Sequence, residues 1–276
     1  MTGTPQLPIR QSRNQMMLAI SLRILLLGLL ALAMTGAARP HAASELTSAE
    51  RDLIKYFEGK LTLKPITTGE RIDRAVVAKA WMKPASAEYL ETYGPNKGKT
   101  FTRTVKSTRK YPEKWPYPKA GAITATIPGE FVFYDAMTPD RGVVTRTELD
   151  MGASVHVVYE PGEVIIPVGK NIPNYTTDVK VYDLHNPGSV QHTGKLVIDA
   201  KDRGDWTVTT PAGTFNCAMF TVTYNGSVGP ANVKDTAILF VHPELGCVGK
   251  VTRNKVSAFL VYSSDDRVAF VLANRK

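Results

Sequence analysis

Cysteine is nearly absent from this chain, and the spacings typical of metal and redox sites are absent altogether. Cys217 and Cys247 are the only cysteines among 276 residues. Neither His-Glu-x-x-His nor Cys-x-x-Cys occurs. Asp183, His185 and His192 flank a Pro-Gly turn, which is ordinary loop composition. The sequence therefore predicts no metal, no cofactor and no identifiable catalytic residue.

Long hydrophobic runs are also missing. The run Ile24–Met34 falls well short of the roughly 20 apolar residues that cross a bilayer as a helix. Basic residues precede this run and small residues follow it: Arg10, Arg13, Arg23, then Ala37, Ala38, Ala42 and Ala43. This order is typical of a secretory signal peptide, so we expect cleavage near Ala42 or Ala43 and a periplasmic protein. Retention as an anchor is the alternative, and the lack of a nearby cysteine excludes a lipoprotein anchor.

The two cysteines lie in the part of the chain that would be exported. Thiols pair in oxidising compartments, so the sequence predicts a disulfide between Cys217 and Cys247. Such a bridge would close a loop of about 30 residues and stabilise the fold by roughly 3–4 kcal/mol. The alternative is two separate buried thiols.

Acidic residues are scarce in one stretch. Residues 44–276 hold 30 basic and 25 acidic residues, a mild excess that is not typical of a nucleic-acid-binding protein. Residues 97–119 alone hold eight basic residues and one acid, Glu113, with aromatic residues between them. We predict that this segment binds an anionic partner through Lys97, Lys99, Arg103, Lys106, Arg109 and Lys110. Envelope lipid, lipopolysaccharide or an anionic polysaccharide would fit, with peripheral membrane contact.

A solvated strand edge protected by lysines is the alternative reading of the same segment. If residues 100–108 form a strand, Lys99 and Arg103 share one face, which we expect to point outward.

The remaining pattern predicts a mainly β fold. Short runs rich in Val, Ile, Thr, Phe and Tyr recur from about Thr100 onward, which is typical of antiparallel strands. The apolar period changes frame between Met219 and Phe220, which predicts a β-bulge and a bent strand. We therefore expect a curved antiparallel sheet or half-barrel.

One or two N-terminal helices should pack on this sheet. Thr47 and Glu50 have the spacing of a capping box, and Leu53, Ile54 and Phe57 form an apolar stripe behind them. Residues 85–93, after Pro84, are a second helical candidate. The expected organisation is a signal peptide at 1–43, a helical and strand segment at 44–99, and an antiparallel β domain at 100–276.

Two motifs in the C-terminal part carry a resemblance. They are Val208-Thr-Thr-Pro-Ala-Gly-Thr-Phe215 and the later run from Thr236 to Lys250. They resemble a group of bacterial envelope proteins of unknown function with the pattern V-x-x-P-A-G-x-F, then a strand, then G-x-V-K. Those proteins are similar to the half-barrels of periplasmic lipoprotein carriers. Here Gly249 separates Val248 from Lys250, and the two cysteines are additional.

From the export signal, the expected curved sheet and its basic segment, we predict a non-enzymatic periplasmic protein that binds or carries an amphipathic or anionic envelope component. Two alternatives stay open: a structural protein of an envelope complex, and a hydrolase whose carboxylates the sequence does not single out. A carrier needs an internal cavity, an adaptor a flat apolar patch, and a hydrolase converging acids.

Overall fold

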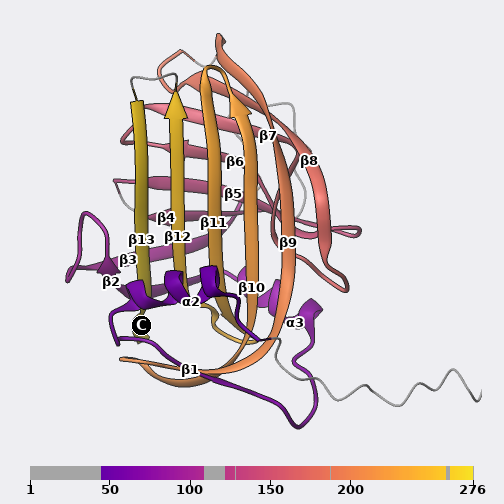
Figure 1. Ribbon diagram of the computed structural model, residues 1–276, viewed down its shortest axis with the longest axis vertical. Helices are drawn as coiled ribbons and strands as arrows, with labels where there is room; N and C mark the ends of the chain where they lie inside the picture. The colour runs from indigo at the N-terminus through magenta and orange to yellow at the C-terminus, as the bar shows by residue number, and fades with distance from the viewer. Residues whose placement is uncertain (1–44, 109–121, 128, 187, 259–261, 276) are drawn as a thin grey trace, which may run out of the picture. The chain divides into compact units, whose positions relative to one another are not determined.

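The computed structural model describes residues 45–108, 122–127, 129–186, 188–258 and 262–275 (Figure 1). The chain divides into two units, 1–41 and 42–276, and the first lies outside the described residues together with the expected signal peptide. No helix of the described ranges is long and apolar enough to cross a membrane. The second unit is built almost entirely from strands.

The helices and strands run in the following order: α2 Ser48–Ile54, 3₁₀-helix η1 Lys55–Phe57, β1 Thr62–Pro65, α3 Arg74–Trp81, β2 Ala85–Tyr93, β3 Thr100–Thr108, β4 Ala122–Ile127, β5 Phe131–Thr138, β6 Gly142–Asp150, β7 Val155–Ile166, β8 Ile172–Asp183, β9 Val190–Thr210, β10 Gly213–Val228, β11 Ala231–His242, β12 Gly246–Ala258 and β13 Tyr262–Arg275.

The sheet is antiparallel and closes on itself. Each strand from β2 to β13 pairs with the next strand along the chain, and β13 returns to pair with β2, for example Val271 with Leu90. The long strand β9 pairs with β10 on one side; on the other it pairs with β8 and, at its lower end, with β1. Strands β9 to β13 form one wall, and β4 to β6 cross behind them (Figure 1). The expected curved antiparallel sheet is confirmed, and it curves far enough to close.

The expected first helix is also confirmed. The Thr47 side chain accepts a hydrogen bond from the Glu50 backbone N–H, and the Glu50 side chain accepts one from the Thr47 backbone N–H. Behind this cap, Leu53 and Phe57 are buried, and the Phe57 ring lies 6.1 Å from that of Phe240 on β11. The apolar stripe therefore covers the outer face of the β10–β12 wall, which leaves the inner face free to enclose a cavity.

The expected second helix at 85–93 is wrong, because this segment is the strand β2. Its side chains have the two-residue period of a strand: Tyr89 and Glu91 are buried, with the less buried Leu90 between them. The second helix is instead α3, whose N-cap Asp73 accepts a hydrogen bond from the Ala75 backbone N–H. Alanine is frequent in this short helix and favours it.

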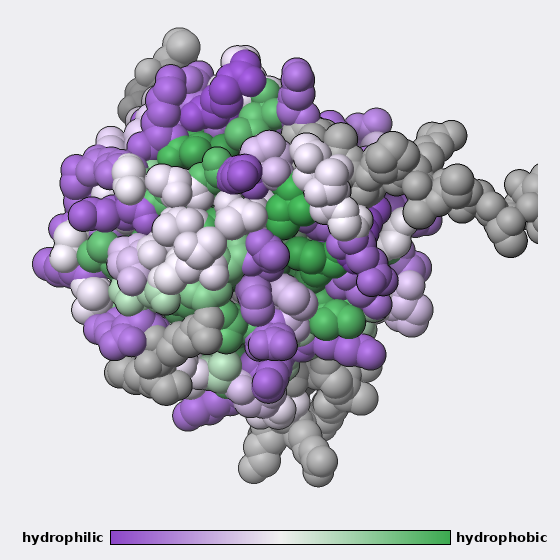
Figure 2. Space-filling view, turned by 90° about the horizontal axis from the view of Figure 1, so that it is seen from below, coloured by the Kyte–Doolittle hydropathy of each residue, from purple (hydrophilic) through white to green (hydrophobic). Residues whose placement is uncertain are grey.

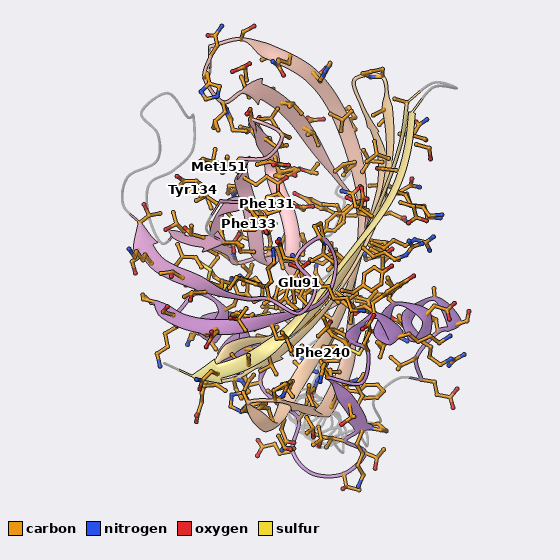
Figure 3. All side chains as sticks on the ribbon, turned by 90° about the vertical axis from the view of Figure 1, so that its left-hand side faces the viewer. Glu91, Phe131, Phe133, Tyr134, Met151 and Phe240 are labelled. Carbon is orange, nitrogen blue, oxygen red and sulfur yellow. The ribbon has the colours of Figure 1, made fainter. Side chains whose placement is uncertain are left out.

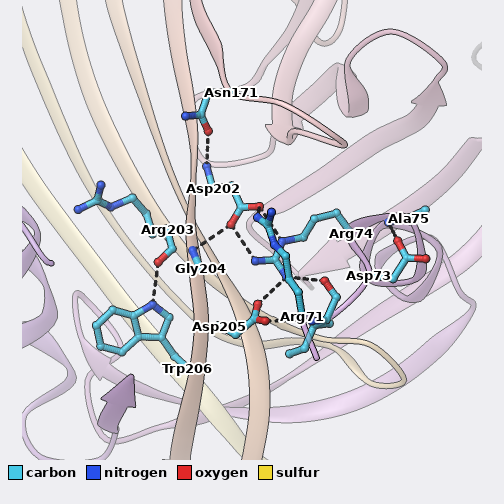
Figure 4. A network of polar contacts seen from close by, with 11 residues as sticks. Arg71, Asp73, Arg74, Ala75, Asn171, Asp202, Arg203, Gly204, Asp205 and Trp206 are labelled. Atoms are coloured by element: carbon cyan, nitrogen blue, oxygen red, sulfur yellow. Dashed lines mark hydrogen bonds and ion pairs between the residues drawn. The ribbon is translucent and has the colours of Figure 1, made fainter. Parts of the chain in front are cut away.

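A network of ion pairs joins α3 to β9 (Figure 4). The Arg74 guanidinium donates to both carboxylate oxygens of Asp202, at 2.7 and 2.8 Å, and its Nη1 lies 2.6 Å from Oδ1 of Asp205. Arg71 also pairs with Asp202. Arg74 is only 6% exposed, so its ion pairs with Asp202 and Asp205 hold α3 at the lower end of the closed sheet with little competition from solvent.

The sheet has an irregularity where the sequence predicts one, although the extra residue lies on the neighbouring strand. Between Ala218 and Phe220 of β10, the partner strand β9 advances from Asp205 to Asp202 and so holds one residue more. Gly204 in this bulge has φ 87°, a conformation that glycine adopts without strain. β10 itself pairs regularly with β11, and its apolar period changes because residues 217–222 are buried on both faces.

Candidate functional site

The closed sheet encloses a cavity of about 370 Å³. Because side chains alternate along a strand, every second residue of β11 faces the cavity: Asp235, Ala237 and Leu239. Phe240 points outward and packs against Phe57. Trp81 of α3 reaches the cavity from the lower end. The other lining residues that matter here are Glu91, Phe101, Arg103, Glu130, Phe131, Phe133, Asp135, Thr145, Glu148, Tyr159, Glu163, Tyr224, Lys250, Arg253, Asn254, Asp266, Val268 and Phe270.

The cavity opens at the side of the sheet. The pairing of β13 with β2 ends at Ala269, so among the described residues the upper part of β13 pairs with β12 alone. Asp266 and Asn254 line the cavity there and are exposed to solvent, which makes this the mouth. Glu91, Phe131 and Phe133 lie on the same side of the sheet (Figure 3). A ligand could therefore enter beside β13, where the described residue Glu130 also lines the cavity.

Four of the seven described acids that line the cavity are named here the enclosed acids: Asp135, Glu148, Glu163 and Asp235. Burial raises the pKa of each of them, because a low-dielectric surrounding disfavours the charged form. The pKa rises to about 7 for Glu148, against an opposing hydrogen bond from Tyr159, and to about 7 for Asp235. For Glu163, burial and then the nearby charge of Glu148 raise the pKa well above its usual value.

Asp135 differs from the other enclosed acids because it has two donors. Trp81 Nε1 donates to one carboxylate oxygen at 2.9 Å, and Thr145 Oγ1 donates to the other at 2.8 Å. These bonds partly offset the effect of burial on its pKa. Asp135 therefore ties α3 to the floor of the cavity as well as lining it.

Two basic residues face these acids, and each also lies over an aromatic ring. Lys250 Nζ is 5.7 Å from the centre of the Phe133 ring, and the Arg103 guanidinium carbon is 4.8 Å from the Trp81 ring. Phe131 and Phe133 stack on one another at 5.6 Å between centroids. The cavity thus combines acids with aromatic faces, a lining that suits a ligand with both apolar and polar parts.

Among the described residues that we expected to bind an anionic partner, Arg103 lies apart from the lysines. Lys97, Lys99 and Lys106 are exposed, and Lys97 forms an ion pair with Glu58 at 2.6 Å. Arg103 is buried and lines the cavity, so the expectation that it points outward is wrong. Phe101, Arg103 and Val105 form the inward face of β3. Arg109 and Lys110 lie outside the described residues.

The enclosed acids were missed in the sequence because no motif marks them. Their one signal is position: Glu148 lies within a strand pattern, between Thr147 and Leu149, where a surface turn would be the usual place for an acid. That signal does not show which acids meet, since they come from the four strands β5, β6, β7 and β11.

The predicted disulfide is absent, since Cys217 and Cys247 are both free and buried. Cys217 lies on β10 and Cys247 on β12, with β11 between them: Ala218 pairs with Val241, which pairs with Cys247. Two strand spacings separate the backbones by about 10 Å, whereas bonded cysteines need Cα atoms within about 7 Å. The even count and the export signal predicted a bond that the strand order prevents.

We therefore predict that both thiols react only when the protein unfolds. Alkylation of the folded, unreduced protein should label neither cysteine, because both are buried and burial raises the pKa of each thiol. Alkylation in denaturant without a reductant should label both, as read by intact mass. An unlabelled denatured protein that gains two labels after reduction would contradict this geometry.

The described residues contain no group of three or more His, Cys, Asp or Glu side chains arranged to hold a metal ion. No family of known proteins matches the chain, and no curated protein matches its sequence. Two solved structures are distantly similar.

One is a protein of Bacteroides fragilis described as exported with a YmcC-like fold, at 14% identity and TM-score 0.34, covering 71% of this chain and 99% of that one. The other is a protein of Parabacteroides distasonis described as a candidate lipoprotein, at 15% identity and TM-score 0.32, covering 71% and 96%. Similarity this distant supports no inference about this chain, whose function must be argued from its own residues.

Proposed function

We propose that this protein is a periplasmic, non-enzymatic binding protein that holds a small amphipathic envelope component inside the closed sheet. The cavity is the observation that carries the proposal: its volume of about 370 Å³ lies in the range of small-molecule sites. Export rests on the signal-peptide pattern at the N-terminus.

The lining supports an amphipathic ligand over a purely apolar one. Aromatic rings such as Phe131 and Phe133 offer apolar faces, while Glu148 and Glu163 offer hydrogen-bonding groups beside them. A simple hydrocarbon chain would cover these carboxyl groups without adding a hydrogen bond to either of them, which is costly in an enclosed site. The ligand should therefore present polar atoms toward the enclosed acids and an apolar part toward the rings.

The lower face offers less support for an adaptor. Seen from below, small hydrophobic areas are separated by hydrophilic residues, and the described residues form no broad continuous apolar patch on this face (Figure 2). A docking surface for a partner protein is usually a larger contiguous patch.

Blocking the mouth should abolish binding of a neutral fluorescent probe such as N-phenyl-1-naphthylamine. Val268 lines the mouth, so Val268→Trp should weaken binding by about tenfold or more, because the indole occupies the entrance. The measurement is a fluorescence titration of the purified protein. Val197→Trp is the matched control, because Val197 is 41% exposed and is not part of the cavity lining. This variant should bind the probe with the affinity of the wild type.

Equal affinity of the Val268→Trp and Val197→Trp variants, or no saturable binding to the wild type, would contradict a ligand site in the cavity. Native mass spectrometry after gentle purification gives an independent reading, because a bound component would add a defined mass.

A further inference from the structure

We propose that the ligand carries a protonated amine, which lies among the enclosed acids while its apolar part packs against the aromatic rings. This inference rests on the proposed function and names the chemical class of the ligand. It departs from the anionic partner that the basic segment of the sequence suggests.

The first argument is the balance of charge within the cavity. The four enclosed acids face two basic residues, Arg103 and Lys250. Arg103 lies over the Trp81 ring, and Lys250 over the Phe133 ring. The third basic residue of the described lining, Arg253, pairs with Asp265. Glu91, Glu130 and Asp266 also line the cavity, so among the described residues there acids outnumber basic residues by seven to three. A cationic ligand would supply a countercharge, whereas an anionic ligand would add to the repulsion.

The second argument is an unpaired atom. Oδ1 of Asp235 is shielded from solvent and makes no hydrogen bond. The backbone N–H of Lys255 lies close enough to this carboxyl group to oppose part of the rise in its pKa. Buried carboxylate oxygens are normally paired, so the carboxyl group of Asp235, a residue of the cavity lining, lacks one of its usual donors. An ammonium group is a donor only and has three N–H bonds to offer.

The third argument is that the aromatic wall already accommodates a cation. Lys250 Nζ lies over the Phe133 ring, which in turn stacks on Phe131, also in the cavity lining. Ring faces attract cations through their quadrupole, most strongly where water is excluded. A ligand amine would therefore find carboxyl groups and ring faces in the same enclosure.

Three probes that share one apolar part can test the charge: 4-phenylbutylamine, 4-phenylbutanol and 5-phenylpentanoate. By calorimetry at pH 8, the amine should bind about tenfold or more tightly than the alcohol, and the carboxylate should bind most weakly. Glu163→Gln combined with Asp235→Asn should weaken binding of the amine by about tenfold. The affinity for the alcohol should stay within about twofold of that of the wild type.

A matched control removes two acids from the outer surface. Glu160 and Asp178 are exposed on β7 and β8, so Glu160→Gln with Asp178→Asn makes the same change in net charge away from the cavity. This variant should bind the amine as the wild type does. A loss in this variant equal to that in the cavity variant would overturn a specific amine site.

The pH dependence gives a further reading. Because burial raises the pKa of Glu148 and of Asp235 to about 7, amine binding should release protons and weaken as the pH falls from 8 to 6, while alcohol binding should stay level. The other titratable groups that act on this pair are Asp135, Asp150, Tyr159, Glu163, Tyr224 and Lys250.

The outcomes separate the two proposals. If the alcohol or the carboxylate binds as tightly as the amine, or if none of the three binds while the naphthylamine probe does, the amine inference is overturned and the binding function stands. If no probe of either kind binds, the proposed function is overturned as well.

Discussion

Replacing Arg74 with alanine should lower the free energy of unfolding by about 3–5 kcal/mol, which is typical when one partner of a buried ion pair is removed. The change would leave the carboxylates of Asp202 and Asp205 at the lower end of the sheet without their bidentate partner. Arg74 also donates to the backbone carbonyl of Ile72, so the entry into α3 would lose a contact too.

Urea unfolding, followed by circular dichroism, measures this effect as a shift in the midpoint at constant m-value. Arg71→Ala is the matched control: Arg71 pairs with the same Asp202 but is 41% exposed, so its loss should cost no more than about 1 kcal/mol. Similar losses in both variants would show that the burial of Arg74 does not determine the strength of the network.

Raising the pH from about 5 to about 8 should destabilise the ligand-free protein. In the folded state the pKa of Glu148 and of Asp235 is about 7, and that of Glu163 is raised as well. In the unfolded chain such groups titrate near pH 4, so between these values the folded state binds more protons and stability falls as pH rises.

Other groups make the folded state more stable as the pH rises, but they do so at lower pH or are fewer in number. Hydrogen bonds and ion pairs lower the pKa of Glu50 and of Asp202 in spite of burial, so their contribution is lost only as the pH falls below about 4. Burial lowers the pKa of His156, which favours the fold at higher pH, yet it is one group against several acids.

The urea midpoint measured across this pH range tests the prediction, and Glu148→Gln should flatten the slope because it removes one of the titrating groups. A midpoint that rises steadily from pH 5 to pH 8 would contradict the burial of the enclosed acids.

The parts of the fold that depend on local chemistry could be predicted from the sequence. Thr47 and Glu50 predicted a helix start, and the recurrent strands predicted a curved antiparallel sheet, because caps and strand alternation act over a few residues. The segment 85–93 was wrongly assigned as a helix because its short apolar pattern, after Pro84, fits both the helical and the strand period. Its pairing with β3 and β13 makes it a strand.

The candidate site could not be predicted, because long-range pairing creates it. Arg103 was expected on the surface because it belongs to a basic run. Its place in the alternation of β3, however, directs its side chain into the cavity. Likewise Cys217 and Cys247 were expected to bond from their even number and the export signal, whereas the strand between them sets their separation. Which acids converge follows only from the closure of the sheet.

That closure has a consequence for how the protein folds. The ring is completed by pairing the last strand, β13, with β2, a contact that joins residues almost 200 positions apart, such as Leu90 and Val271. Contacts this distant in sequence require a long loop to close, at a cost in chain entropy, before they can stabilise the fold. Proteins that depend on such contacts therefore fold slowly. The chain cannot complete its ring until its C-terminal residues are available, and until then both unpaired edges of the sheet need protection from aggregation.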